Sequence, residues 1–207
     1  YFYPATVLTA VPDSAEMLRE EIFGPVAALQ TFKSEDEVIK RAREAGVEYI
    51  VTIGTTVESS RDAVMLADKY DFIYAAVGIH PHEVKDILHP AYDILRRFAS
   101  HKKVVAYGEI GLDYHYEHSP RADQKRKFRD MLREARMLEL PVIVHDRDAH
   151  EDTLQILSEE WSPELGGVLH CYSGDLAMAT RAIEMGFSLS IAGPVTFPKA
   201  EALRDVV

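Results

Sequence analysis

The chain has 207 residues, a length that fits one domain of ordinary size with a substantial hydrophobic core. Hydrophobic residues make up 47% of it, and no apolar run approaches the roughly 20 residues of a membrane-spanning helix. The net charge of −11 argues against a protein that coats nucleic acid through a broad basic surface, but a metal ion can still supply positive charge at one site. The single cysteine excludes an internal disulfide, and the N-terminus has no signal-peptide pattern, so we expect a cytoplasmic protein without membrane contact.

From about residue 37 onward, runs of strand character alternate with runs of helical periodicity. The expected strands are residues 49–53, 72–77, 104–110, 141–145, 167–170 and 187–191. The expected helices are residues 37–45, a helix capped by Ser59 or Ser60, residues 91–98, 122–138 and 151–157, and a helix capped by Asp175. This alternation predicts an α/β fold with a parallel sheet. A closed TIM-type (β/α) barrel has eight strands, so six predict an incomplete barrel with open sheet edges that could support oligomers.

Three of the expected strands end on side chains that bind metals. The runs VVAYGE, PVIVH and GVLH end on Glu109, His145 and His170. Because the C-terminal ends of parallel strands meet at one rim of a barrel, we expect these three side chains to ligate a shared cation. Each has a simpler alternative, which is a salt bridge for Glu109 and a core hydrogen bond for the histidines. The repetition in successive strands favours metal ligands.

Polar residues after two of the strands are further candidates. His80 and His82 lie in the segment GIHPH, where extended backbone places both rings on one side. We expect His80 at the active rim, whereas His82 belongs either to the site or to a solvated loop. Arg147 follows His145 and either binds a substrate phosphate or forms an ion pair with Asp146, Asp148 or Glu151. Asp113 and Tyr114 are expected to shape the loop after Glu109.

Residues 37–207 resemble the TatD family of metal-dependent hydrolases. The matching stretches are AREAGVEYIVTIGT, YAAVGIHPHE, VVAYGEIGLDYHY, LPVIVHDRDAHEDTLQIL and GGVLHCYSG. The resemblance implies a TIM-type barrel that hydrolyses phosphodiester bonds, typically in DNA, with one or two divalent ions (Mg²⁺, Mn²⁺ or Zn²⁺). It implies that Glu109 bridges two metals, that His145 and His170 bind one of them, and that His80 lies near the scissile phosphate. Glu109 and His80 are then the expected catalytic residues.

Two departures from the family pattern leave an alternative open. No histidine precedes residue 80, although the family carries a His-x-His pair near its N-terminus, and the chain ends before the family's later strand-end aspartate. The alternative is therefore a catalytically inactive barrel fragment with a structural role.

Residues 1–36 resemble a different family, the aldehyde dehydrogenases. The segment containing EEIFGPV is similar to the stretch that follows the catalytic cysteine of those enzymes, where Glu21 and Phe23 would touch the nicotinamide end of NAD. The segment has neither a cysteine nor a GxGxxG turn, so we expect no NAD binding. The predicted organisation is an aldehyde-dehydrogenase-like segment, 1–36, joined to a partial TatD-like barrel, 37–207.

Overall fold

The computed structural model describes residues 6–9, 11–12, 15, 26–29, 32–87 and 90–207. The chain forms two compact units, Tyr1–Glu48 and Tyr49–Val207. In the first unit, β1 (Thr6–Thr9) pairs in parallel with β2 (Val26–Leu29), and α1 (Glu35–Glu44) follows, capped by Ser34. Most of the predicted aldehyde-dehydrogenase-like segment, including Glu21 and Phe23, lies outside the described residues.

The second unit contains a six-stranded parallel sheet in which the strands follow one another in chain order. The strands are β3 (Ile50–Ile53), β4 (Ile73–Val77), β5 (Val104–Asp113), β6 (Val142–Arg147), β7 (Gly167–His170) and β8 (Phe187–Leu189). This arrangement confirms the predicted α/β class with a parallel sheet.

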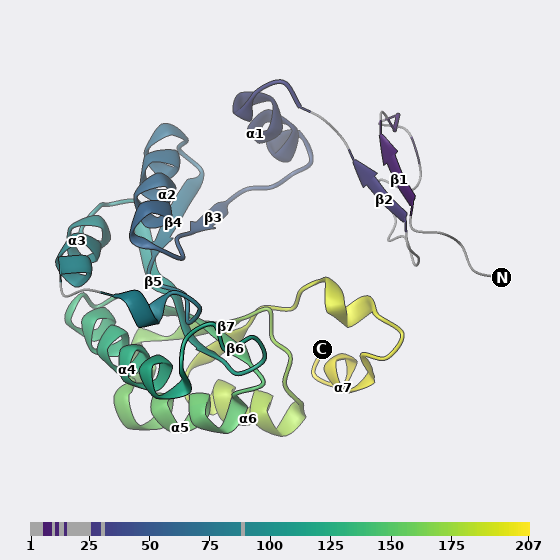
Figure 1. Ribbon diagram of the computed structural model, residues 1–207. Helices are drawn as coiled ribbons and strands as arrows, with labels where there is room; N and C mark the ends of the chain where they lie inside the picture. The colour runs from purple at the N-terminus through teal and green to yellow at the C-terminus, as the bar shows by residue number, and fades with distance from the viewer. Residues whose placement is uncertain (1–5, 10, 13–14, 16–25, 30–31, 88–89) are drawn as a thin grey trace. The chain divides into compact units, whose positions relative to one another are not determined.

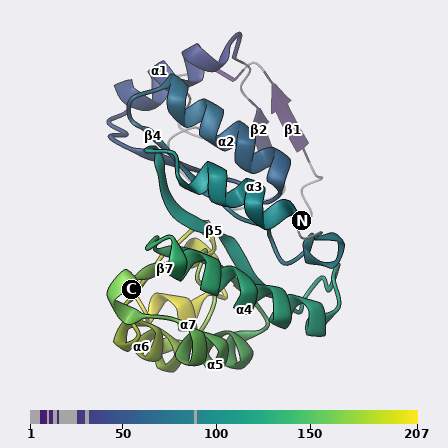
Figure 2. The same ribbon diagram turned by 90° about the vertical axis from the view of Figure 1, so that its left-hand side faces the viewer.

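Helices connect successive strands of the second unit, as a parallel sheet requires. They are α2 (Val57–Lys69), α3 (Pro90–Ala99), α4 (Arg121–Met137), α5 (His150–Glu160) and α6 (Leu176–Glu184), with short 3₁₀ turns at Val84–Asp86 and Pro163–Leu165. A 3₁₀ turn at Gly193–Thr196 and helix α7 (Glu201–Arg204) follow β8. Helices α2 to α6 follow one another along the outer side of the curved sheet (Figures 1 and 2). None of the described helices is long and apolar enough to cross a bilayer.

The core lies between the sheet and these helices, and helix α4 packs against strand β5. Phe128, Met131 and Leu132 of α4 are fully buried, as their helical spacing predicted, and so are Tyr107 and Ile110 of β5. Burial of such side chains stabilises the fold by about 1.5–3 kcal/mol each. The core thereby holds β5 firmly, and β5 carries two carboxylates at its C-terminal end.

The start of α2 differs from the prediction that Ser59 or Ser60 caps it. Thr56 is the N-cap: its hydroxyl accepts from the N–H of Ser59 (3.1 Å), and the Ser59 hydroxyl accepts from the N–H of Thr56 (2.8 Å). Ser60 is fully buried and binds both the N–H (3.2 Å) and the carbonyl (3.3 Å) of Gly78. It therefore anchors the end of β4, just before His80.

Strand β5 extends three residues beyond the predicted end at Ile110 because its partner β6 is also longer than predicted. Leu112 pairs with Asp146, and Asp113 pairs with Arg147. The register shifts between Gly108 and Ile110, which leaves Glu109 as an extra residue in the ladder. Such irregularities re-aim a side chain.

Candidate metal centre

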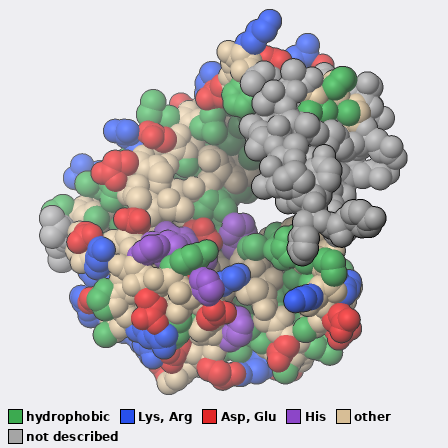
Figure 3. Space-filling view, turned by 45° about the vertical axis from the view of Figure 1, so that its right-hand side comes forward, with side chains coloured by type: hydrophobic (Ala, Val, Ile, Leu, Met, Phe, Trp, Pro, Cys, Tyr) green, Lys and Arg blue, Asp and Glu red, His purple; other side chains and the backbone are tan. Residues whose placement is uncertain are grey.

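The C-terminal ends of four neighbouring strands bring the predicted ligands to one rim. His80 follows β4, Glu109 and Asp113 lie on β5, His145 lies on β6, and His170 ends β7. His145 and His170 are direct partners in the parallel ladder. Histidine side chains gather on the face of the molecule shown in Figure 3.

The imidazoles of His145 and His170 both contact the carboxylate of Glu109. Its N–H donates to the carbonyl of Gly54 (3.1 Å), and the residue is only 9% exposed. Its Oε1 lies 3.3 Å from Nδ1 of His145 and 3.1 Å from Nδ1 of His170. Burial raises the pKa of this carboxyl, but the two imidazole hydrogen bonds outweigh burial and bring the pKa to about 2. Glu109 is therefore a carboxylate.

The structure brings all three predicted metal ligands together, and it adds His80. The possible ligand atoms of His80, Glu109 and His145 lie within 4.8 Å of one another, and the rings of His80 and His145 are 4.3 Å apart. The compact group thus contains His80, whereas the side chain of His170 lies outside this group and bonds the shared Glu109 oxygen. Two imidazoles and a carboxylate are donors that suit a divalent transition metal.

His80 is oriented by the backbone of its own segment. The N–H of His82 donates to Nδ1 of His80 (3.3 Å), which leaves the proton of the neutral ring on Nε2. Burial and the neighbouring His145 lower the pKa of His80 to about 4, so this imidazole is neutral at pH 7. It can offer an N–H donor without carrying charge.

Asp113, which was expected only to shape a loop, holds two imidazoles. Its side chain is 1% exposed, and Oδ2 lies 2.9 Å from Nε2 of both His82 and His145. His82 is therefore part of the histidine cluster and not of a solvated loop. Burial raises the pKa of Asp113, but hydrogen bonds from the Tyr116 N–H and from both imidazoles bring the pKa to about 2.

The strand pattern explains this arrangement. Glu109, Gly111 and Asp113 alternate along β5, and Gly111 pairs with His145. A Cβ at Gly111 would lie 2.0 Å from the carbonyl oxygen of His145, and the φ of Gly111 is +141°. Glycine therefore lets the two strands approach so that the His145 ring sits between the two carboxylates. The signal in the sequence was the motif Glu-x-Gly-x-Asp.

His145 consequently has a carboxylate on each ring nitrogen. Burial lowers its pKa, but the hydrogen bonds to Glu109 and Asp113 raise it above the usual histidine value. The ring geometry assigns Nε2 to Asp113 and turns Nδ1 toward Glu109.

Arg147 lies exposed at the end of β6. Among the described residues its guanidinium makes no hydrogen bond or ion pair, and its three expected partners are bound elsewhere. Asp146 bonds His150 (2.6 Å), Asp148 bonds His115 (3.0 Å), and Glu151 bonds Arg181 (3.2 Å). The ion-pair alternative for Arg147 is therefore wrong.

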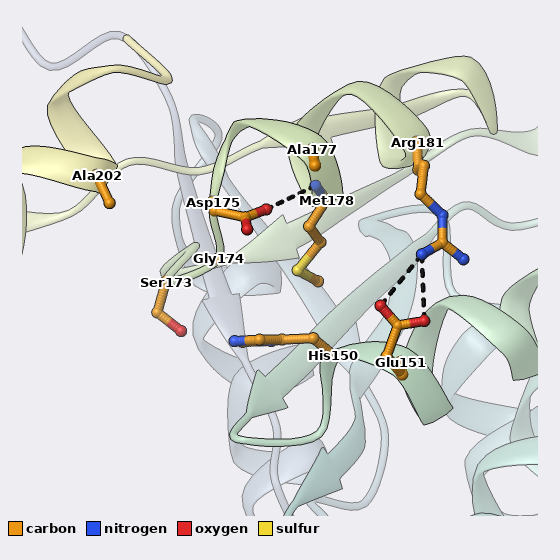
Figure 4. A pocket seen from close by; sticks show the side chains of 9 residues that line it. All are labelled: His150, Glu151, Ser173, Gly174, Asp175, Ala177, Met178, Arg181 and Ala202. Carbon is orange, nitrogen blue, oxygen red and sulfur yellow. Dashed lines mark hydrogen bonds and ion pairs between the residues drawn. The ribbon is translucent and has the colours of Figure 1, made fainter.

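A pocket of about 350 Å³ opens between the segments that follow β6 and β7 (Figure 4). Its lining includes His150, Ser173, Asp175 and Arg181. Asp146 binds Nδ1 of His150 and raises the pKa of this imidazole, and the ring points into the pocket toward Ser173 (Figure 4). The pocket belongs to the same rim as the ligands.

Comparison with known proteins identifies the class. The sequence profile described as TatD related DNase matches residues 27–207. An uncharacterized metal-dependent hydrolase of Bacillus subtilis, YabD, is 42% identical over 172 residues, which cover 83% of this chain and 68% of the relative. The 3'-5' ssDNA/RNA exonuclease TatD of Cronobacter turicensis is 38% identical and covers 81% of this chain and 64% of that protein.

Solved structures give the same result. YJJV, a TatD homologue from Escherichia coli, superposes with a TM-score of 0.77 at 33% identity and covers 83% of this chain and 67% of its own. A hydrolase TatD family protein from Entamoeba histolytica has the same fold, with a TM-score of 0.74 at 24% identity and coverage of 83% and 60%.

The chain belongs to the TatD family of metal-dependent hydrolases. It spans about two thirds of the length of the curated relatives. The match begins at residue 27, and the comparisons lend no support to an aldehyde-dehydrogenase-like segment at residues 1–36. The predicted boundary at residue 37, the cytoplasmic location and the oligomers through open sheet edges stay predictions.

Proposed function

We propose that this chain hydrolyses phosphodiester bonds in DNA, with a divalent metal held by Glu109, His145 and His170. The observation that carries the proposal is the single Glu109 oxygen that faces two imidazoles from neighbouring strands. A buried carboxylate with two histidines is costly to maintain without charge compensation, and a cation supplies that compensation. A relative named as a 3'-5' ssDNA/RNA exonuclease makes a nucleic acid strand the first substrate to test.

The donor set fits the divalent ions that hydrolases use. Imidazole favours Zn²⁺, and a carboxylate also accommodates Mg²⁺ and Mn²⁺. When bound, such an ion lowers the pKa of water and polarises a phosphoryl oxygen. Glu109 would bridge two ions if both are bound.

The remaining rim residues would handle the phosphate. The Nε2–H of His80 is a neutral donor beside the ligands, so it would hydrogen-bond a phosphate oxygen as charge accumulates there. Arg147, whose guanidinium has no partner among the described residues, would bind the phosphate through two N–H groups. These two side chains would orient the scissile bond.

The test combines metal analysis with cleavage of end-labelled single-stranded DNA in Mg²⁺, Mn²⁺ or Zn²⁺. We expect metal to be retained after dialysis by the wild type and to be lost by a His145→Ala plus His170→Ala double variant, together with cleavage. His101→Ala is the matched control, because His101 precedes β5 at the other end of the sheet and pairs with Asp68.

Equal metal content in the wild type and the double variant would reject this site. Metal binding without cleavage of DNA or RNA would reject the nuclease and favour the alternative of an inactive domain with a structural role.

A further inference from the structure

We infer that Asp113 is a positioning residue that fixes the tautomer of His145, so that Nδ1 of this imidazole is free of a proton and faces Glu109. The inference deepens the proposed function, because it concerns the same metal site. Asp113 acts through the imidazole of His145, which lies between the carboxylates of Asp113 and Glu109.

The orientation of the Asp113 carboxylate is fixed on both oxygens. Oδ1 accepts from the backbone N–H groups of His115 (3.1 Å) and Tyr116 (2.8 Å). Oδ2 is left to the Nε2 atoms of His82 and His145. The carboxylate therefore cannot turn without giving up two backbone hydrogen bonds, and backbone N–H groups left without a partner destabilise the folded protein.

The backbone that carries Asp113 is fixed as well. The side chain of Gln124, which is fully buried, accepts from the N–H of Asp113 (2.7 Å) and donates to the carbonyl of Asp113 (2.9 Å). A third hydrogen bond ties Gln124 to the carbonyl of Ser119 (2.8 Å). Helix α4 thus holds the end of β5 at the position where the carboxylate meets His145.

An acceptor on one ring nitrogen determines which nitrogen can bind a metal. A neutral imidazole has one N–H, and both carboxylates can only accept, so the proton stays on Nε2, which lies nearer to its carboxylate (2.9 Å to Asp113) than Nδ1 lies to Glu109 (3.3 Å). The unprotonated Nδ1 then faces the Glu109 oxygen at 3.3 Å, which is the arrangement that a cation between them requires. The same carboxylate orients His82, whose ring lies 4.3 Å from His80.

Asparagine at this position would impose the opposite tautomer. The amide oxygen would stay with the two backbone N–H groups, because only an acceptor can satisfy them. The amide NH₂ would then face His145, whose Nε2 must become the acceptor, and the ring proton would move to Nδ1. Replacement of a histidine-orienting aspartate by asparagine is known to preserve geometry while it selects the wrong tautomer.

The experiment is ¹⁵N NMR of the His145 ring in the metal-free protein, recorded above the pH at which His145 loses its second proton. In the wild type we expect the proton on Nε2, and in Asp113→Asn on Nδ1. Calorimetry with Mn²⁺ or Zn²⁺ should then show affinity that is weaker by on the order of 10-fold to 100-fold in Asp113→Asn.

Asp148→Asn is the matched control. Asp148 also accepts from a histidine at this rim, His115, and its φ of +54° suits asparagine equally well. This variant should leave the His145 tautomer and the metal affinity unchanged.

The proposal is overturned if neutral His145 of the wild type carries its proton on Nδ1, a result that needs no variant and so does not depend on how well Asp113→Asn folds. It is also overturned if Asp113→Asn keeps the proton on Nε2, or if the tautomer changes while metal affinity does not. The NMR readout uses neither metal nor DNA. Failure of the proposed nuclease activity would therefore leave the assignment of the His145 tautomer intact.

Discussion

Two aspartate–histidine pairs lie on the same rim but present opposite ring nitrogens. In one pair Asp113 binds Nε2 of His145, and Nδ1 faces a second carboxylate. In the other, Asp146 binds Nδ1 of His150 and the ring points into an open pocket. The first histidine turns Nδ1 toward Glu109, and the ring of the second points toward Ser173 in the pocket. Under the proposed function the first would bind a cation and the second would contact the substrate.

The largest effect is expected from Glu109→Gln, which removes the negative charge that Nδ1 of His145 faces. We expect metal affinity to fall more than about 100-fold, beyond the loss typical of residues that only orient a ligand. DNA cleavage should fall with it. Calorimetry measures the metal affinity, and cleavage of end-labelled DNA measures the activity. Wild-type metal affinity in Glu109→Gln would show that this carboxylate is not a ligand.

Gly111→Ala should have the second-largest effect, since the added methyl group pushes strands β5 and β6 apart. A Cβ there would collide with the carbonyl of His145, and the φ of +141° is unfavourable for alanine. We expect unfolding free energy to drop by about 2–3 kcal/mol, measured by urea titration.

Gly193→Ala is the control for that substitution, because no heavy atom lies within 4 Å of a Cβ at Gly193. A drop of equal size in both variants would show that the close approach of β5 and β6 is not the cause.

His150→Gln tests the other pair. It removes the imidazole that points into the pocket but leaves the proposed ligands alone, so we expect KM for DNA to rise about 5-fold, the equivalent of about 1 kcal/mol, with metal affinity unchanged. Steady-state cleavage and calorimetry separate the two quantities. A variant with weaker metal binding and unchanged KM would contradict the division of roles between the pairs.

The smallest effect is a pH dependence of stability from His150. Asp146 raises the folded-state pKa of this imidazole above its unfolded value, with help from Asp148 and Asp175. The stabilisation is therefore complete below the unfolded pKa of about 6.5 and is lost as pH rises through the folded pKa. Because the ring is partly exposed, we expect only a few tenths of a kcal/mol.

Urea titrations of wild type and His150→Gln at several pH values check this. The difference between their unfolding free energies should shrink as pH rises, and a difference that grows would contradict the sign.

The sequence predicted the elements that depend on local patterns. The six strands follow from buried runs in the sequence, and the meeting of Glu109, His145 and His170 follows from the polar residues that end three of these runs. Helix α4 was equally clear, because its apolar residues recur at helical spacing.

The sequence did not predict what depends on pairing between distant segments. The local pattern predicts a strand that ends at Ile110 and a loop shaped by Asp113. Only the register with β6 shows that the strand continues and that Gly111 makes room for its neighbour. The ion pairs expected between Arg147 and the neighbouring carboxylates do not form for a similar reason. His115 and Arg181 reach Asp148 and Glu151 from other segments.

The hydrogen bond from the Glu109 N–H to the carbonyl of Gly54 makes the candidate site sensitive to a residue outside it. A Cβ at Gly54 would lie 2.3 Å from the Ser60 hydroxyl, which anchors Gly78 just ahead of His80. One residue without any donor side chain therefore adjusts both the aim of the carboxylate and the loop of a histidine. A side chain at this position would thus disturb the candidate site without replacing any of its polar side chains.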